Sequence, residues 1–381
     1  MGRERPRGGA TARRGRAPGR RGTGQGVTSR RSRSRGGRTQ PSPGRVIRVL
    51  AAAVIAMIVS ILVGPKFIEF LRRNEFGQHI REELPQGHQV KQGTPTMGGL
   101  LILVVATIAF LSVSKYKVPA LTVLFVTLGC GAIGFLDDFI KLTHRRSLGL
   151  RGRWKLVLLA LITVGVGFAA NHQHLPTTVF IPVVHWNVQL SYGWYVLLFL
   201  VIAGTANGVN LTDGLDGLAA GTGIIALITF TGISVVTYIR SGNPGGRFDS
   251  RLDLAIVGAA LIGAAIGFLW YNAFPAEVIM GDTGSFAIGG ALAAMAIFTK
   301  TIFLLLLIGG IFALEALSVI VQVVSFKYFN RRVFLMAPIH YHFEMKAWSE
   351  TKIMVRFWIV TAILCAIGFA LFYRDFTFFR R

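Results

Sequence analysis

The strongest constraint on this chain is a series of apolar stretches, several of which are long enough to cross a lipid bilayer. An α-helix rises about 1.5 Å per residue, so about 20 apolar residues span the ~30 Å hydrocarbon core. Of the 381 residues, 52% are hydrophobic, which is too many for an ordinary soluble domain of this length. The sequence therefore predicts an all-α integral membrane protein with about ten transmembrane helices. We place the spans at residues 46–71, 97–114, 118–136, 155–170, 190–207, 217–239, 252–270, 284–299, 301–323 and 354–373.

The first 45 residues differ in kind from the rest. They hold 14 Arg and one Glu among Gly, Pro, Ser and Thr, and they carry more than half of the net charge of +24. Such a composition cannot bury a core, so we expect a disordered Arg/Gly-rich tail over 1–45 and a ten-span membrane domain over 46–381. Some Arg-rich tails bind nucleic acid or anionic lipid, but we favour a dispensable tail and expect no nucleic-acid partner.

Basic residues are unevenly divided between the two sets of loops that ten spans create. The odd-numbered loops carry fifteen Lys and Arg residues, and the even-numbered loops carry six. By the positive-inside rule the odd-numbered loops are cytoplasmic. An even number of spans then places both termini outside, with the Arg-rich tail on the disfavoured side. Either the tail is not native, or its translocation is costly, or one span is miscounted.

The unusual polar strings of the sequence all fall in or beside the odd-numbered loops. Loops that converge on one face can build a composite active site, so we expect active-site loops on the cytoplasmic side. The strings are KQGTPTMGG (91–99), GFLDDFIK (134–141), NGVNLTDGLDGL (207–218), YNAFPAEVIMGDTGS (271–285) and APIHYHFE (337–344).

Asp137 and Asp138 end the third predicted span, one helical turn before Lys141. Acidic residues in or near a membrane segment are costly and therefore indicate function. Neighbours on a helix point about 100° apart, so one carboxylate can meet a metal or act as a base while the other holds Lys141 or a backbone group. The alternative is a helix end that is simply solvated by charge.

Asn207, Asn210, Asp213 and Asp216 follow one another at steps of three, which stacks amide and carboxylate oxygens along one edge of a helix or tight loop. Oxygen ligands of this kind suit Mg²⁺ or Mn²⁺. The alternative is a polar loop with a helix cap.

Asp282 lies in a second Gly-rich loop, just before the eighth predicted span. Helix N-termini attract anions, so this loop can hold phosphate or, through Asp282, the metal that binds phosphate. Ser285 as an ordinary helix cap is the alternative. Asn272, upstream, offers an amide to the edge of a base or sugar.

His340 and His342 alternate after Pro338. In an extended loop their imidazoles point the same way and can clamp a diphosphate, while Tyr341 points away. Two surface histidines without a role are the alternative. Lys91 says little by itself, because a P-loop spacing is absent. The whole set, carboxylates for a divalent cation with amides and cations for phosphates, fits phosphoryl transfer to a membrane-borne acceptor.

Together, these strings resemble the polyprenyl-phosphate N-acetylhexosamine-1-phosphate transferase superfamily, and within it the phospho-N-acetylmuramoyl-pentapeptide transferases. TPTMGG, the DDxxK in DDFIK, NxxNxxDGxDGL and PIHxHFE occur in the family's order within residues 46–381. The last string separates the muramoyl branch from the N-acetylglucosamine-1-phosphate branch. The resemblance implies a Mg²⁺-dependent reaction in the bacterial cytoplasmic (inner) membrane, in which UDP-N-acetylmuramoyl-pentapeptide and undecaprenyl phosphate give UMP and lipid I.

The resemblance also implies roles for single residues. The implied catalytic residues are Asp137, Asp138, Asp213, Asp282 and His340, and the implied metal ligands are Asp213 and Asp282. Tyr341 replaces the middle member of the family's histidine triplet. Substrate contacts fall to Lys91, Thr96, Lys141, Asn207, Asn210, Asp216, Asn272 and His342.

Two other functions remain open at the level of sequence. A sister transferase would use UDP-N-acetylglucosamine with the same kind of lipid phosphate, and the APIHYHFE string argues against it. An ion-coupled transporter would carry its acids near the middle of the bilayer, whereas these acids lie at span ends. The sequence also leaves assembly into a homodimer open.

Overall fold

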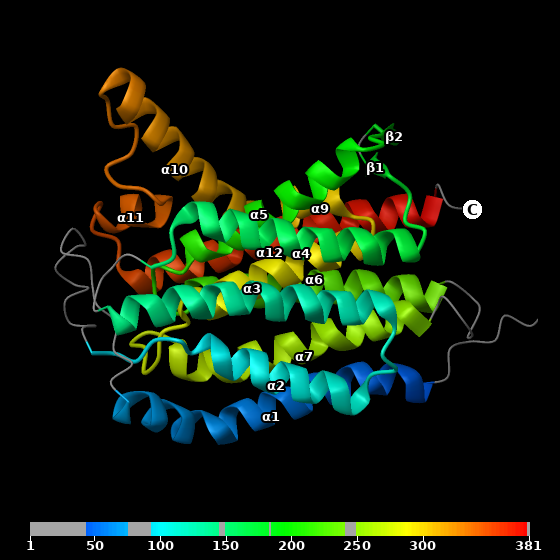
Figure 1. The fold of residues 1–381 in the computed structure, drawn as a ribbon, viewed down its shortest axis with the longest axis horizontal. Helices are drawn as coiled ribbons and strands as arrows, with labels where there is room; N and C mark the ends of the chain where they lie inside the picture. The colour runs from blue at the N-terminus through cyan, green and yellow to red at the C-terminus, as the bar shows by residue number, and fades with distance from the viewer. Residues whose placement is uncertain (1–42, 75–92, 145–148, 183, 241–248, 379–381) are drawn as a thin grey trace, which may run out of the picture. The chain divides into compact units, whose positions relative to one another are not determined.

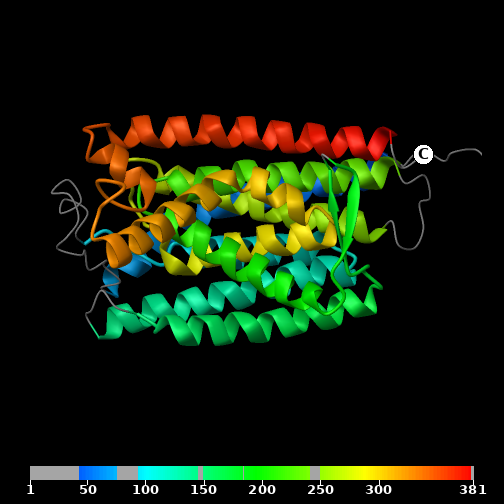
Figure 2. The same ribbon diagram turned by 90° about the horizontal axis from the view of Figure 1, so that it is seen from above.

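The structure, a computed structural model, describes residues 43–74, 93–144, 149–182, 184–240 and 249–378. Most helices run alongside one another, as Figures 1 and 2 show from two directions. The elements are α1 (Pro43–Arg73), α2 (Gly99–Val113), α3 (Val118–Thr143), α4 (Gly152–His172), β1 (Thr178–Ile181), β2 (Trp186–Gln189), α5 (Gly193–Thr212), α6 (Leu218–Arg240), α7 (Asp249–Asn272), α8 (Gly281–Phe298), α9 (Ile302–Ile308), α10 (Gly310–Phe329), α11 (Ile339–Glu344) and α12 (Glu350–Phe378).

The helices confirm the prediction of an all-α integral membrane protein. Within the described ranges, nine helices are long and apolar enough to span a membrane, and α2 is apolar but has only 15 residues. The ten predicted spans correspond in order to α1 to α8, to α9 with α10, and to α12. The predicted tail lies outside the described residues, except that Pro43–Arg45 already belong to α1.

The ninth predicted span, 301–323, is not one helix. The chain forms the short helix α9, breaks at Gly309 and continues as α10. In Figure 1, α10 leans away from the other helices. Two consecutive glycines, Gly309 and Gly310, explain the break, because such a pair weakens a helix and permits a sharp kink.

A small β-hairpin between α4 and α5 was not predicted. β1 and β2 pair antiparallel, with Thr178 opposite Gln189 and Ile181 opposite Trp186. Both strands have only four residues. They lie between two apolar stretches and are too short to give a recognisable pattern of their own in the sequence.

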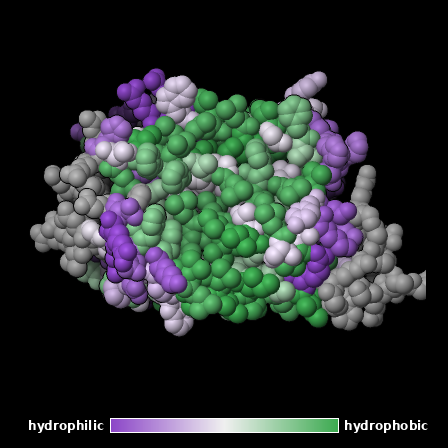
Figure 3. Space-filling view, turned by 60° about the horizontal axis from the view of Figure 1, so that its bottom comes forward, coloured by the Kyte–Doolittle hydropathy of each residue, from purple (hydrophilic) through white to green (hydrophobic). Residues whose placement is uncertain are grey.

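The middle of the bundle is formed by α7 and α8, whose apolar residues are buried almost throughout. α7 packs against α1 and α6, and α8 packs against α3 and α5. Apolar side chains on outer helices, such as Leu62 and Phe168, are instead exposed. Figure 3 shows a continuous hydrophobic surface with hydrophilic residues gathered at its two ends, as expected for helices that face lipid.

The polar strings meet at one end of the helix bundle. The C-terminal ends of α3, α5 and α7, the start of α8 and the helix α11 all lie at the left of Figure 1, whereas α12 ends at the right. The predicted convergence of the odd-numbered loops on one face is thus confirmed for the described residues.

Candidate active site

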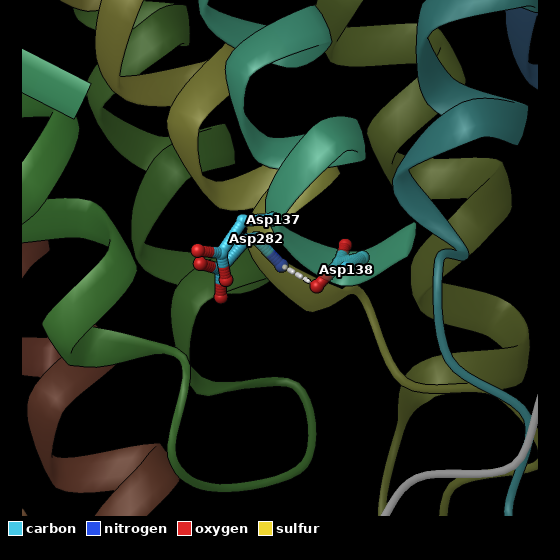
Figure 4. Close-up of side chains that lie close together, drawn as sticks. All are labelled: Asp137, Asp138 and Asp282. Atoms are coloured by element: carbon cyan, nitrogen blue, oxygen red, sulfur yellow. Dashed lines mark hydrogen bonds between the residues drawn. The ribbon is translucent and has the colours of Figure 1, made fainter. Parts of the chain in front are cut away.

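The centre of this end is a cluster of three carboxyl groups. Asp137 and Asp138 are supplied by the last turns of α3, and Asp282 is the second residue of α8. One oxygen of each lies within 4.8 Å of the others. Figure 4 shows Asp137 and Asp282 side by side, with Asp138 on the other side of the α8 backbone.

Asp138 binds the beginning of α8. Its carboxylate accepts hydrogen bonds from the backbone N–H groups of Asp282, at 3.1 Å, and Thr283, at 2.9 Å, and from the Thr283 hydroxyl at 2.7 Å. A carboxylate here satisfies helix N–H groups that have no partner inside the helix and complements the positive end of the helix dipole. Of the two roles that the sequence allowed for the pair, Asp138 therefore holds backbone groups.

Asp137 and Asp282 share two lysine side chains. The Lys141 Nζ lies 2.5 Å from Asp137 Oδ2 and 3.1 Å from Asp282 Oδ1. The Lys155 Nζ lies 3.0 Å from Asp137 Oδ1 and 2.9 Å from Asp282 Oδ2. The result is a closed square of two anions and two cations.

Lys155 was missed by the sequence reasoning, which counted it only as one of several basic loop residues. It lies in the first turn of α4, the helix that follows α3, and belongs to none of the five strings. Its ammonium group also lies 4.9 Å from the centre of the Phe286 ring on α8. Because Lys155 belongs to no motif, its contacts become apparent only in the fold.

Close backbone approaches hold the cluster in place. A Cβ added at Gly134 would lie 2.1 Å from the backbone oxygen of Asp282, so only glycine lets α3 come this near to α8. Gly281 has a φ of +74°, which glycine adopts without strain. On the other side of Asp137, the Leu150 N–H donates to its Oδ1 at 2.7 Å, and a Cβ at Gly149 would lie 2.4 Å from that oxygen.

The Asn and Asp residues at steps of three divide into different roles. Asn207 donates to Ala203 O in its own helix, and Asn210 donates to Ser285 Oγ on α8. Asp213 follows α5 and faces the acidic cluster. Burial raises the pKa of Asp213 to about 8, and the charges of Asp282 and Asp138 act in the same direction. This environment favours the neutral carboxyl group, and a nearby cation would favour the carboxylate.

Asp216 and Asn272 join two loops at this end. Asp216 accepts a hydrogen bond from the Ala276 N–H at 3.0 Å. Asn272 accepts from the Gly217 N–H at 3.1 Å and donates to Val278 O at 2.9 Å. Both side chains are buried, so their contacts first of all fix the loops.

The TPTMGG string is only partly described. Lys91 lies outside the described residues. Thr96 is buried, and a Cβ added at Gly281 would lie 2.9 Å from its hydroxyl oxygen. The string thus reaches the turn that carries Asp282, as the convergence of loops requires.

The expectation that His340 and His342 lie in an extended loop is wrong. Ile339–Glu344 form the helix α11, in which residues two apart point in nearly opposite directions. His340 is completely buried. The His342 Nδ1 instead accepts a hydrogen bond from the Leu335 N–H at 3.1 Å, and burial lowers the pKa of the His342 imidazole. The two rings therefore do not form a clamp.

Tyr341 does not point away from the site, as had been expected. A Cβ added at Gly214 would lie 2.9 Å from the Tyr341 hydroxyl and 2.2 Å from His340 Nε2. His340 and Tyr341 thus both meet the loop that follows Asp213. Burial raises the pKa of the Tyr341 phenol, and the charges of Glu344 and Asp213 add to this.

The acidic cluster can hold a metal ion. Carboxylate oxygens are hard ligands of the kind that Mg²⁺ prefers, and the cluster carries more carboxyl groups than the two lysines neutralise. Within the cluster, Asp137 and Asp282 are the suitable donors, because the oxygens of Asp138 are already bound to α8. Asp213, the other predicted metal ligand, is not one of the three clustered carboxyl groups. Lys141 and Lys155 contact oxygens of Asp137 and Asp282, so a bound cation would compete with their ammonium groups for these carboxylates.

Comparison with known proteins gives a consistent result. Residues 120–300 match the model of glycosyl transferase family 4, and residues 91–103 match signature 1 of the phospho-N-acetylmuramoyl-pentapeptide-transferases. The chain is similar to the phospho-N-acetylmuramoyl-pentapeptide-transferase of Rubrobacter xylanophilus, with 46% identity over 85% of this chain and 97% of the relative. It is similar to the enzyme of the same name from Frankia alni, with 44% identity over 86% and 98% of the two chains. It is also similar to the enzyme of this name from Geobacillus sp., with 44% identity over 84% of this chain and 96% of the relative.

Proposed function

The chain belongs to the phospho-N-acetylmuramoyl-pentapeptide-transferase family, and we propose on that premise how its site performs the lipid I-forming reaction of peptidoglycan synthesis. The reaction transfers phospho-N-acetylmuramoyl-pentapeptide from a UDP-linked donor to a polyprenyl phosphate in the membrane. The observation that supports a phosphoryl-transfer site best is the square of Asp137, Asp282, Lys141 and Lys155 at the end of the bundle.

The finer identity of the substrates is part of the proposal. We take the lipid to be undecaprenyl phosphate and the donor to be UDP-N-acetylmuramoyl-pentapeptide. The donor is a charged, water-soluble molecule, so the site faces the compartment that supplies it. The excess of basic residues in the odd-numbered loops supports the cytoplasmic side of a bacterial inner membrane. Assembly into a homodimer stays a prediction.

The cofactor proposed for the site is Mg²⁺. Asp282, Asp137 and Asp213 would hold it, and when bound it would neutralise charge on the phosphates. With these carboxylates engaged by the cation, the Lys141 and Lys155 ammonium groups would be available to contact phosphoryl oxygens. The lysines thus serve as counter-ions without substrate and as phosphate ligands with it.

The proposed chemistry is a direct displacement. A phosphate oxygen of the lipid attacks the β-phosphorus of the donor, the bond from that phosphorus to the bridging oxygen breaks, and UMP leaves. Asp137 is the carboxylate of the α3 pair that faces the reacting groups, because Asp138 is bound to α8. A covalent route through Asp137 would need it to be freed from two lysines, so alignment of two bound anions is the simpler course.

The test is a turnover assay with purified full-length protein in detergent, Mg²⁺ and undecaprenyl phosphate. UDP-N-acetylmuramoyl-pentapeptide should give UMP and lipid I in equal amounts, and UDP-N-acetylglucosamine should give neither. Release of UMP from the second donor alone would identify the sister transferase. Correctly inserted protein that releases UMP from neither donor would contradict the proposed function.

A further inference from the structure

A buried pair of ionisable side chains joins α10 and α11. Glu315, in the second turn of α10, and His340, in α11, are both completely buried. The Glu315 Oε1 lies 3.1 Å from the His340 Nδ1. The sequence reasoning assigned no role to Glu315, which lies within an apolar span. An acidic side chain in a membrane helix is costly to bury, so it needs an explanation.

The other nitrogen of this imidazole faces the active-site loop. Within the described residues, the buried His340 Nε2 has no hydrogen-bond partner, and neither has Glu315 Oε2. The Nε2 atom lies where a side chain at Gly214 would be, since a Cβ there would be only 2.2 Å away. Gly214 directly follows Asp213, so Nε2 is directed at the loop that faces the acidic cluster.

The contact with Glu315 determines which nitrogen of His340 carries a proton. If Glu315 is ionised, its carboxylate only accepts hydrogen bonds, and Nδ1 is the donor toward α10. A buried carboxylate also needs a counter-charge, which a protonated imidazole supplies. In that state Nε2 also bears a proton, and it is directed away from Glu315, toward the Gly214 loop.

We propose that Glu315 is a positioning residue, which fixes the ring of His340 so that its Nε2–H is presented to a phosphoryl oxygen of the bound donor. The proposal rests on the proposed function, because it takes a diphosphate as the ligand beside Gly214. A pair that served packing alone would not leave a buried ring nitrogen without a partner against the loop that follows Asp213.

The first experiment is a double-mutant cycle, measured as kcat and KM for the UDP-linked donor. Glu315→Leu keeps much of the side-chain volume and removes the acceptor. We expect kcat/KM to fall roughly 10- to 100-fold, the range seen when the partner that orients a functional imidazole is lost. In a His340→Ala background the same change should cost less than about twofold, because Glu315 acts only through His340.

The matched control is Ser318→Ala. Ser318 is buried one turn further along α10 and donates to the backbone oxygen of Glu315, but the structure gives it no contact with His340. This variant should keep kcat/KM within about twofold of the unmodified protein. An undiminished effect of Glu315→Leu in the His340→Ala background would show a merely structural role and overturn the proposal. If Glu315→Leu does not insert, Glu315→Gln takes its place in the same cycle and is judged by the same criterion.

A second measurement does not depend on turnover. In protein labelled with ¹⁵N-histidine, the signals lost in His340→Ala belong to His340. We expect these signals to show protons on both ring nitrogens in the unmodified protein and a loss of this state in Glu315→Leu. Unchanged signals would overturn the proposal even if the enzyme is active, whereas changed signals in a protein that releases no UMP would mean that the proposed function alone has failed.

Discussion

Lys155 connects the two carboxylates that we place at the centre of the chemistry, and its replacement by methionine tests that arrangement. The Lys155 Nζ lies 3.0 Å from an oxygen of Asp137 and 2.9 Å from an oxygen of Asp282. Methionine has a similar length and no charge. Without the ammonium group, the two carboxylates are neutralised only by Lys141 and repel each other more strongly.

The size of the effect follows from the geometry. The carboxylate oxygens lie within 4.8 Å of each other, and two unit charges at this distance repel by about 3.5 kcal/mol at an effective dielectric constant of about 20. Removing one partner of a buried ion pair typically costs about 3–5 kcal/mol. Because Lys141 still contacts both carboxylates, we expect Lys155→Met to lower the free energy of unfolding by about 2–4 kcal/mol when no divalent cation is present.

The assay is thermal unfolding in detergent, with either a chelator or saturating Mg²⁺. Since Mg²⁺ brings positive charge to the same oxygens, it should raise the melting temperature of Lys155→Met more than that of the unmodified protein. Lys115→Met is the control, because Lys115 forms a half-exposed ion pair with Asp249 in a loop at the opposite end. Equal Mg²⁺-dependent shifts in all three proteins would refute the shared site for lysine and metal.

Four further predictions follow from the site. Asp282→Asn should lower turnover by at least about 10²-fold and weaken Mg²⁺ binding, because a metal-linked carboxylate is lost. Asp138→Asn should change the Mg²⁺ affinity measured by calorimetry by no more than a few-fold. It should lower the free energy of unfolding by about 1–2 kcal/mol, because the neutral amide caps the N-terminus of α8 less well than the carboxylate does. Gly149→Ala should displace Asp137 and reduce kcat, whereas Gly152→Ala, where an added Cβ meets nothing within 4 Å, should leave steady-state kinetics unchanged. Tyr341→Phe should raise the KM for the UDP-linked donor more than about threefold, or about 0.65 kcal/mol, because the Tyr341 hydroxyl contacts the Gly214 loop. An unchanged KM would mean that Tyr341 does not contribute to donor binding, as the prediction of an extended loop implied.

The sequence predicted the all-α membrane fold and the order of its apolar helices, because length and hydropathy determine what can cross a bilayer; against the ten predicted spans, the described residues form nine helices long enough to cross and the shorter α2. It also predicted that five polar strings meet, since alternate loops must share one side. The break at Gly309 was within reach of the same reasoning, because two consecutive glycines are visible in the sequence. The ninth span was nevertheless taken as one helix, since its hydropathy is continuous.

The contacts inside the site were harder to predict from spacing. The sequence showed that Asp137 and Asp138 point apart, but not which of them faces the start of α8. It assumed an extended backbone for APIHYHFE, although the N-terminal Pro338 is also typical of a helix start. Glu315 and Lys155 belong to no motif. Their roles depend on which side chains of other helices lie beside them, and that information is absent from the local sequence.

The central claim is that a divalent cation binds between α3 and α8, at Asp282 and Asp137, where the lysines now lie. Anomalous diffraction from crystals of the protein soaked in Mn²⁺ tests this claim most directly. We expect an anomalous peak about 2 Å from oxygens of Asp282 and Asp137, with Lys141 or Lys155 displaced from the carboxylates. A peak held by Asp138 or the His342 region, with the square of Asp137, Asp282, Lys141 and Lys155 intact, would contradict it.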